Sequence, residues 1–281
     1  MESLVSVCIP VYNGESFIGE TIQMILKQDY DNMEILISDN ASTDNTVKEI
    51  IKIQDTRIRI FINNTNIGMG GNWNSLIKQA KGEYVIIVCA DDFLLPGAIK
   101  AKAEVLDRNS DVNIVFSSSY VMNEKGRKIM KRRPFRGNCK LDGKKMQQEL
   151  FIKRNFFAEP INNMLRRSAM LHTGEFDEKL WYTIDWDYWI RILSEGNAYY
   201  IDKPYSGFRI SSSSATGSSL SGKEKILKDE YVFINKYKKE KIIPITQEML
   251  ELRNKNIQKR LKQKILFMKF GTIMSKIKGR R

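Results

Sequence analysis

The sequence predicts an α/β protein with a mixed, mainly parallel sheet flanked by helices, followed by a basic helical C-terminal extension. Short apolar segments alternate with amphipathic segments through residues 1–123. A Ser-rich stretch occupies residues 211–222, and the chain after it is amphipathic and rich in lysine and arginine. We therefore expect one domain over residues 1–210, a flexible connector over 211–222 and a helical extension over 223–281.

The elements of the first half are predicted from the period of their apolar residues. Strands are expected at residues 4–13, 33–42, 58–64, 84–90 and 111–123. Helices are expected between them, at residues 16–28, 43–54, 70–80 and 96–109. Short strands alternating with helices of this length are typical of right-handed βαβ units on a parallel sheet.

The pattern changes after Asn123. Residues 124–138 are rich in lysine and arginine, which predicts a positively charged hairpin or loop. Further helices are expected at residues 143–155, 183–196, 223–240 and 246–278.

The net charge is concentrated near the C-terminus. The chain carries a formal net charge of +13, but eleven lysines and arginines and no acidic residue lie between Arg253 and Arg281. Taking 11 from 13 leaves about +2 for residues 1–252. A nucleic-acid-binding domain is expected to carry a basic face on the folded domain itself, so this distribution argues against nucleic acid as a partner.

The cysteine and histidine content excludes several kinds of site. Cys8, Cys89 and Cys139 are far apart, and two of them lie in apolar runs, so free thiols in a reducing compartment are expected rather than disulfides. His172 is the only histidine, which excludes a histidine-rich metal site and leaves this residue a surface or packing role. Without a secretory leader pattern or a run of about 18–20 apolar residues, the chain is expected to be cytoplasmic.

Polar residues follow each strand of the first half. They form four clusters: Tyr12-Asn13, Asp39-Asn40, Asn63–Asn66 and Asp91-Asp92. Ligands of an open parallel sheet bind at the carboxyl ends of its strands. We therefore expect all four clusters to line one edge of the sheet.

The residue types in these clusters indicate a ligand class. The chain has neither a G-x-G-x-x-G fingerprint nor a P-loop, which disfavours a dehydrogenase and a P-loop NTPase. Tyr12 could stack on a nucleobase, and Asp39 could accept a hydrogen bond from it. Asp91-Asp92 would suit a hard divalent cation that bridges to phosphates. Together these residues predict a site for a nucleoside diphosphate.

The chain resembles glycosyltransferase family 2, inverting enzymes of the GT-A (Rossmann-like) fold, in four segments: "VSVCIPVYNGESFIGETIQMIL", "EILISDNASTDNT", "NIGMGGNWNSLIKQAKGEY" and "CADDFLLPGAI". The resemblance covers about residues 3–210. It implies a nucleotide-sugar-binding half at residues 1–123 and an acceptor-binding half at residues 124–210.

The resemblance also implies roles for individual residues. Tyr12 and Asp39 would hold the nucleobase, and Asp91 and Asp92 would hold a manganese or magnesium ion. Many members read L-D-x-D-D where this chain has Cys89 at the first acid, so the metal role falls on Asp91, with Asp92 behind it. The implied nucleotide-sugar-binding residues are Pro10, Tyr12, Glu15, Asp39, Asn66, Asp91 and Arg209.

A fifth segment, "WYTIDWDYWIRI" (Trp181–Ile192), resembles the part of the family that carries the general base, which falls on Asp185. Ile184 stands where many members have glutamate. An inverting transfer needs a carboxylate beside the acceptor hydroxyl to take its proton. The alternative is that Asp185 only caps the helix that follows it.

Other interpretations also have structural alternatives. Asp91-Asp92 alone would suit a cap for the helix beginning near Pro96 or a turn, and Tyr12 and Asp39 lie in sequences that favour turns. Arg209 is interpreted as a surface charge, with a contact to the diphosphate as the alternative. Lys131–Arg133 is interpreted as a solvated loop, with acceptor binding as the alternative. Three tryptophans are interpreted as core residues, with stacking on a sugar as the alternative: Trp181, Trp186 and Trp189.

The C-terminal segment carries an apolar stripe that includes Ile257, Leu261, Ile265 and Met268. This stripe would pack on the protein or a second subunit, or lie on an anionic membrane surface. The absence of acidic residues favours the membrane. A peripheral position on the cytoplasmic membrane face would fit a lipid-linked acceptor of polysaccharide assembly, which the resemblance suggests.

The sequence therefore predicts an inverting, metal-dependent glycosyltransferase. It would move a sugar from a nucleoside diphosphate, expected to be UDP, to a hydroxyl of a saccharide or lipid-linked saccharide. One alternative is a nucleotidyltransferase on a related fold, although the Gly- and Lys-rich loop that it would need is absent. The other is a non-catalytic membrane or nucleic-acid adaptor. The sequence is compatible with an oligomer.

Overall fold

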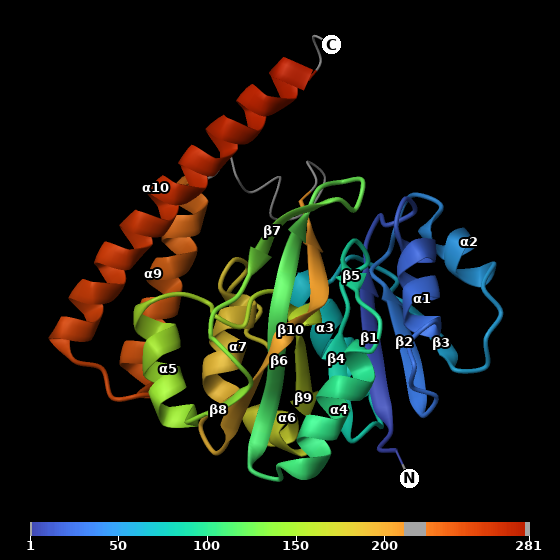
Figure 1. Ribbon diagram of the computed structural model, residues 1–281, viewed down its shortest axis with the longest axis horizontal. Coiled ribbons are helices and arrows are strands. Elements are labelled where there is room, and N and C mark those ends of the chain that lie inside the picture. The colour runs from blue at the N-terminus through green and yellow to red at the C-terminus, as the bar shows by residue number, and fades with distance from the viewer. Residues whose placement is uncertain (1, 211–222, 279–281) are drawn as a thin grey trace.

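The computed structural model describes residues 2–210 and 223–278, with side chains described up to Gln263. Within these residues a ten-stranded mixed sheet forms the centre, and helices cover both of its faces (Figure 1). The predicted α/β class is confirmed. The connector predicted at residues 211–222 lies outside the described residues.

The first half of the chain builds one end of the sheet. Its elements are β1 (Val5–Val11), α1 (Ile18–Leu26), β2 (Met33–Asp39), α2 (Thr46–Ile51), β3 (Ile58–Ile62), α3 (Gly68–Lys78) and β4 (Tyr84–Ile87). The four strands pair in parallel in the order β3-β2-β1-β4, which confirms the predicted βαβ units. All residues of β1 and β4 are buried because both faces of this part of the sheet are covered.

The second half extends the sheet with strands of both directions. Its elements are β5 (Phe93–Leu94), α4 (Ala98–Arg108), β6 (Val112–Met122), β7 (Lys128–Arg132), β8 (Cys139–Leu141), α5 (Gly143–Ile152), the 3-10 helix η1 (Pro160–Asn162), β9 (Asn163–Arg166), α6 (Arg167–Thr173), α7 (Ile184–Ile192) and β10 (Asn197–Arg209). β6 and β7 form the predicted charged hairpin. β9 was not predicted, and it pairs antiparallel with both β4 and β6.

Two apolar clusters fill the space between the sheet and its helices. Trp73, Trp186 and Trp189 all belong to the cluster that contains α5 and α7 residues. The Trp73 ring packs edge-on against Phe176, with ring centres 5.1 Å apart. Burial confirms the core interpretation of Trp186 and Trp189, while Trp181 is only half-buried.

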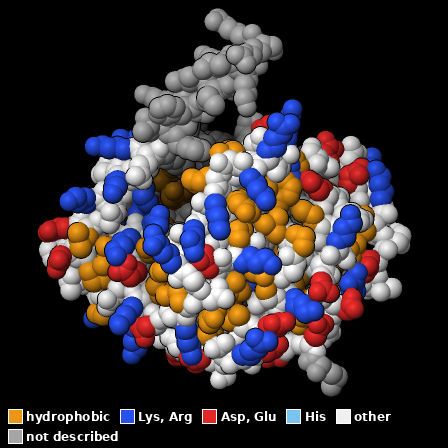
Figure 2. Space-filling view, viewed as in Figure 1, with side chains coloured by type: hydrophobic (Ala, Val, Ile, Leu, Met, Phe, Trp, Pro, Cys, Tyr) orange, Lys and Arg blue, Asp and Glu red, His pale blue; other side chains and the backbone are white. Residues whose placement is uncertain are grey.

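Charges of both signs are spread over the surface. Figure 2 shows lysine and arginine side chains interspersed with acidic and apolar ones over the face in view. This mixture agrees with the small net charge of residues 1–252. Among the described residues, no helix combines the length and apolar character needed to cross a bilayer.

Two long helices follow the sheet, as predicted. α9 (Lys223–Glu240) and α10 (Gln247–Lys278) lie beside α5 and α7 (Figure 1). Ile257 and Leu261 of α10 pack against Ile226 of α9, so the packing interpretation holds for these two residues of the apolar stripe. Ile265 and Met268 lie outside the described side chains.

A buried ion pair ties α10 to α9 and α5. Arg253 is fully buried and donates hydrogen bonds to the Glu230 carboxylate and to the carbonyl oxygen of Phe151. Its guanidinium lies 4.1 Å from the ring centre of Phe233 and 4.8 Å from that of Trp186. A buried charge is tolerated only with partners of this kind.

We expect Arg253→Met to lower the free energy of unfolding by about 3–5 kcal/mol, because it leaves the buried Glu230 carboxylate short of a partner. Urea denaturation measures this loss. Arg108→Met is the control, because its ion pair with Glu104 is exposed and contributes less than about 1 kcal/mol. Equal losses in the two variants would contradict a structural role for the buried pair.

Candidate active site

Three of the four predicted polar clusters meet at the carboxyl edge of the sheet. The Asn40 amide donates to Asn66 Oδ1 at 3.0 Å, and the Asn63 amide donates to Asn40 Oδ1 at 3.1 Å. The backbone N–H of Thr43 donates to Asn13 Oδ1 at 2.8 Å. The loops after β1, β2 and β3 are therefore joined by side-chain amides at this edge.

An exposed aromatic ring and a buried carboxylate lie at the ends of β1 and β2. Tyr12 is 50% exposed, whereas Asp39 is 1% exposed. Asp39 Oδ2 accepts a hydrogen bond from the Ser42 N–H at 3.0 Å, but Asp39 Oδ1 has no hydrogen-bond partner in the described part of the chain. A buried acceptor without a partner is costly, so this oxygen is suited to an N–H donor of a ligand.

Pro10, Glu15 and Asn66 have visible structural roles. Pro10 is buried in β1 beside Ser38 of β2. Glu15 Oε2 accepts hydrogen bonds from the backbone and side-chain amides of Asn45 at 2.9 and 3.1 Å. Asn66 Oδ1 also accepts from the Gly68 N–H. A contact of these three residues with a nucleotide sugar stays a prediction.

Asp91 and Asp92 form a carboxylate pair just after β4. Asp92 is 2% exposed, and its pKa is raised well above the usual range by burial, by the charge of Asp91 and by that of Glu159. Burial also raises the pKa of Asp91. The capping alternative is wrong, because α4 begins at Ala98 with Gly97 as its N-cap and receives no side-chain cap.

The chemistry of this pair fits a hard divalent cation. Carboxylate oxygens are the ligands that magnesium and manganese prefer, and a cation would offset the repulsion between the two acids. Among the described residues, no group of three or more Asp, Glu, His or Cys side chains gathers to hold a metal.

Arg209 is not the surface charge that we expected. Arg209 is 4% exposed. Its guanidinium lies 4.4 Å from the ring centre of Phe17 and 4.1 Å from that of Phe93. Its Nε donates to the Asp91 carbonyl oxygen at 2.8 Å, and its Nη2 donates to Glu20 Oε2 at 2.7 Å. Arg209 therefore holds the backbone of the carboxylate pair, and a diphosphate contact stays a prediction.

Asp185 lies in the first turn of α7. The N-cap of this helix is Thr183, so the interpretation of Asp185 as the cap is wrong. Asp185 Oδ1 accepts from the Trp186 N–H at 2.7 Å, and Oδ2 accepts from the Asn155 side chain at 3.2 Å. Burial raises the pKa of Asp185 to about 7, and the charge of Glu159 adds to this rise.

The N-terminus of α7 is capped from a distant helix. Asp229 of α9 accepts hydrogen bonds from the Trp181 N–H at 2.8 Å and from the N–H and hydroxyl of Thr183 at 2.9 and 2.7 Å. Lys236 of α9 pairs with Asp187 of α7 at 3.0 Å. These bonds fix the turn that carries Asp185. Asp229 could not be predicted, because nothing local in the sequence relates it to α7.

A second missed feature is Glu159, whose negative charge raises the pKa of both Asp92 and Asp185, in each case after the larger effect of burial. Glu159 also follows Ala158, whose carbonyl oxygen accepts from the same Asn155 amide that donates to Asp185, so its segment lies beside the acid of α7. Glu159 itself is paired with Arg132 of β7.

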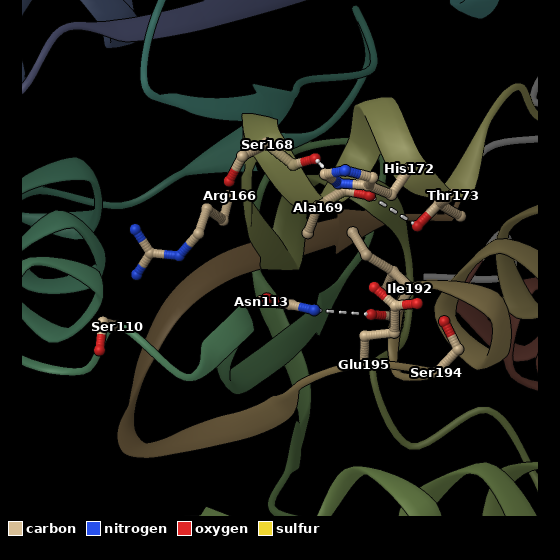
Figure 3. A pocket seen from close by; sticks show the side chains of 10 residues that line it. All are labelled: Ser110, Asn113, Arg166, Ser168, Ala169, His172, Thr173, Ile192, Ser194 and Glu195. Atoms are coloured by element: carbon tan, nitrogen blue, oxygen red, sulfur yellow. Dashed lines mark hydrogen bonds between the residues drawn. The ribbon is translucent and has the colours of Figure 1, made fainter.

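A separate cavity of about 160 Å³ lies at the amino end of β6 (Figure 3). The guanidinium of Arg166 on its wall donates to the carbonyl oxygens of Leu106, Asn109 and Val112, which gives it a structural role. His172 also lines this cavity, and its Nδ1 lies 2.9 Å from the Ser168 carbonyl oxygen. The only histidine is therefore remote from the carboxyl edge, as the predicted surface role implies.

Comparison with known proteins identifies a family. Residues 6–173 match the model of "Glycosyl transferase family 2". An uncharacterized glycosyltransferase of Methanocaldococcus jannaschii is 30% identical over 198 residues, which cover 68% of this chain and 65% of that protein. The glycosyltransferase GlyG of Streptococcus pneumoniae is 33% identical over 126 residues, covering 44% of this chain and 42% of that protein. The chain thus spans less than two thirds of the length of these relatives.

Solved structures share the fold. S. aureus TarS (residues 1–349) in complex with UDP-GlcNAc superposes with a TM-score of 0.66 at 21% identity, covering 80% of this chain and 63% of that one. The mannosyltransferase PcManGT of Pyrobaculum calidifontis, in complex with GDP-Man and Mn²⁺, superposes with a TM-score of 0.61 at 17% identity, covering 93% and 70%. The sheet and its helices therefore have the GT-A fold of glycosyltransferases.

We expect Asp229→Ala to expose the amides of Trp181 and Thr183 to solvent exchange and to destabilise the protein by about 1–2 kcal/mol, the usual cost of a lost cap. Hydrogen exchange followed by mass spectrometry measures the first effect, and urea denaturation the second. Asp142→Ala is the matched control, because Asp142 caps α5 through the Lys145 N–H and does not contact α7. Unchanged exchange in the Trp181–Thr183 segment would refute the cap.

Proposed function

This chain belongs to glycosyl transferase family 2, and from that premise we propose that it is an inverting glycosyltransferase that uses a nucleoside diphosphate sugar. UDP is the proposed nucleotide. The proposed acceptor is a hydroxyl of a saccharide or lipid-linked saccharide in the synthesis of a polysaccharide or glycoconjugate. Family membership argues against the nucleotidyltransferase and adaptor alternatives.

The observation that carries this proposal is the Asp91-Asp92 pair after β4 together with Asp185 in the first turn of α7. Asp91-Asp92 and Asp185 come from different elements, yet the charge of Glu159 raises the pKa of both Asp92 and Asp185. An inverting transfer needs a site for the diphosphate and a base on the opposite side of the reacting carbon. Asp91-Asp92 would supply the first, and Asp185 would supply the second.

The donor would be held at its two ends. The Tyr12 ring would stack on the nucleobase, and the unpartnered Oδ1 of Asp39 would accept a base N–H. Asp91, with Asp92 behind it, would hold a manganese or magnesium ion. When bound, such an ion offsets the charge of the diphosphate leaving group. Arg209 keeps the Asp91 backbone in position through its bond to the carbonyl oxygen.

Asp185 is the proposed general base. Its carboxylate would take the proton of the acceptor hydroxyl as the hydroxyl oxygen bonds to the anomeric carbon and the diphosphate leaves. A pKa of about 7 suits this role, because the group is then a stronger base than an ordinary carboxylate and about half of it is still ionised near neutral pH. The bond from Asn155 and the capped start of α7 hold the carboxylate in place.

Support for the donor and the metal comes from relatives of the same fold. TarS binds UDP-GlcNAc, and PcManGT binds GDP-Man with Mn²⁺. The choice of UDP for this chain rests on its resemblance to the family. Contact of the C-terminal extension with an anionic membrane is a further proposal, which would involve surfaces other than Ile257 and Leu261, since these two side chains pack on α9.

Calorimetric titration with UDP, GDP and dTDP, each with and without manganese, tests the donor site. We expect manganese-dependent binding of one nucleotide, and we expect Asp91→Ala to abolish it because the metal loses its main ligand. Asp29→Ala removes a carboxylate that is mostly exposed and should not alter binding. If nucleotide affinity depended neither on manganese nor on Asp91, the metal would bind at another site or would not be used.

The transfer rate tests Asp185. We expect Asp185→Asn to bind the donor normally and to lose about 10²-fold or more in kcat, the scale of a general base. In the wild type, kcat/KM should fall as the pH drops below about 7, because the raised pKa leaves Asp185 protonated there. Initial rates at saturating manganese across this range measure the profile. If Asp185→Asn kept both the wild-type rate and the fall in kcat/KM below about pH 7, the base would be another residue.

A further inference from the structure

We propose that Arg132 and Glu159 form a sugar-recognition pair that binds neutral oxygen atoms of the transferred sugar, such as hydroxyl or N-acyl oxygens. This proposal rests on the proposed function and specifies its donor. Arg132 is the last residue of β7, and Glu159 precedes η1. The Arg132 Nη1 donates to both oxygens of Glu159, at 2.7 and 2.6 Å.

The pair lies between the two carboxylate groups of the site. Glu159 follows Ala158, whose carbonyl oxygen accepts a hydrogen bond from the Asn155 amide at 3.2 Å, and the same amide donates to Asp185 Oδ2 at 3.2 Å. The Arg132 guanidinium lies 5.3 Å from the ring centre of Phe208, the residue before Arg209, whose backbone N–H donates to Asp92 Oδ1 at 3.1 Å. The transferred sugar must lie between the diphosphate near Asp91-Asp92 and the base Asp185. The sugar-recognition pair is therefore beside the space that the sugar would occupy.

Both side chains are accessible to a ligand. The Arg132 side chain is 31% exposed and that of Glu159 is 24% exposed. An arginine offers N–H donors at Nε, Nη1 and Nη2. In the described part of the chain, Arg132 Nε and Nη2 have no hydrogen-bond partner, since both bonds to Glu159 come from Nη1. These donors are free for an oxygen of the ligand, and each Glu159 oxygen can accept a further bond from a hydroxyl.

The backbone that carries Glu159 is held in an unusual conformation. Ala158 has a φ of 58°, which is uncommon for a residue with a Cβ. Its carbonyl oxygen accepts hydrogen bonds from Asn155 and Trp189, at 3.2 and 3.4 Å. The Asn163 amide donates to the carbonyl oxygens of Phe157 and Glu159, at 3.0 and 2.9 Å. Such positions persist where the surroundings determine them, and they cluster at binding sites.

The charge of the site selects the class of sugar. The sugar-recognition pair is neutral as a unit, and it adjoins the acids Asp92 and Asp185. A carboxylate on the sugar would be repelled by Glu159 and these acids. Hydroxyl and N-acyl oxygens can accept from Arg132 without this repulsion, and hydroxyls can also donate to Glu159. Uronic-acid donors should therefore be excluded.

Calorimetry with manganese tests the proposal, with UDP as the sugar-free probe and with UDP-glucose, UDP-N-acetylglucosamine and UDP-glucuronate as sugar probes. If GDP is the nucleotide that binds, GDP and GDP-mannose replace them. We expect the wild type to bind a nucleotide with a neutral sugar more tightly than the free nucleoside diphosphate. In the UDP series, it should also bind the neutral sugar nucleotides more tightly than UDP-glucuronate. Arg132→Gln and Glu159→Gln should each reduce the preference for the neutral sugar about tenfold and change affinity for the free diphosphate less than about twofold.

Arg133→Gln is the matched control. Arg133 is the next residue along the hairpin and also forms a bidentate pair, with Asp202, but its side chain is 47% exposed on the other side of the strand. It should leave all affinities unchanged. If Arg132→Gln does not fold, Glu159→Gln and Arg132→Lys carry the test.

Three outcomes would overturn the sugar-recognition pair: wild-type preference retained in both site variants, an equal loss of affinity for the free diphosphate, or no wild-type preference for any sugar nucleotide. The absence of any manganese-dependent nucleotide binding by the wild type would instead overturn the proposed function, and the sugar-recognition pair with it.

Discussion

Two adjacent carboxylates at the end of a buried strand are the electrostatic constraint around which this edge of the protein is arranged. Asp91 and Asp92 follow β4, and burial opposes the ionisation of both. Arg209 is a buried counter-charge for Asp91; its guanidinium packs against two aromatic rings, and its backbone N–H donates to Asp92 at 3.1 Å. The last residue of β10 is thereby joined to the segment after β4, and the two halves of the chain meet at the acids.

The same constraint accounts for the convergence of the β6–β7 hairpin on the site. Arg209 Nη1 donates to the Glu124 carbonyl oxygen in the turn between these strands, at 2.7 Å. At the far end of β7, Arg132 reaches Glu159. The hairpin is therefore attached to the site at both ends. Its basic composition, which suggests a solvated loop when considered alone, includes a side chain with a specific partner inside the site.

The sequence predicts the parts of this structure that depend on local pattern. The strands and helices of the first half follow from apolar periodicity, and Asp39 and Asp91 could be placed at the carboxyl edge because Asp39 ends β2 and Asp91 lies shortly after β4. β9 could not be predicted, since it has four residues and its antiparallel neighbours are distant in the sequence. The burial of Arg209 was missed for the same reason, because it depends on Phe17 and Phe93, which are more than a hundred residues away.

The cap that Asp229 supplies to α7 also has a consequence for the order in which the site is assembled. Asp229 is 46 residues after Thr183 in the chain. At a translation rate of about 5–20 residues per second, it is made roughly 2–9 s after the helix that it completes. During this interval the start of α7 lacks its acceptor. A chain released before α9 would lack both this acceptor and the rings of Phe233 and Tyr237, which belong to the apolar core beside α7. Premature termination would therefore leave the turn that carries Asp185 unsupported.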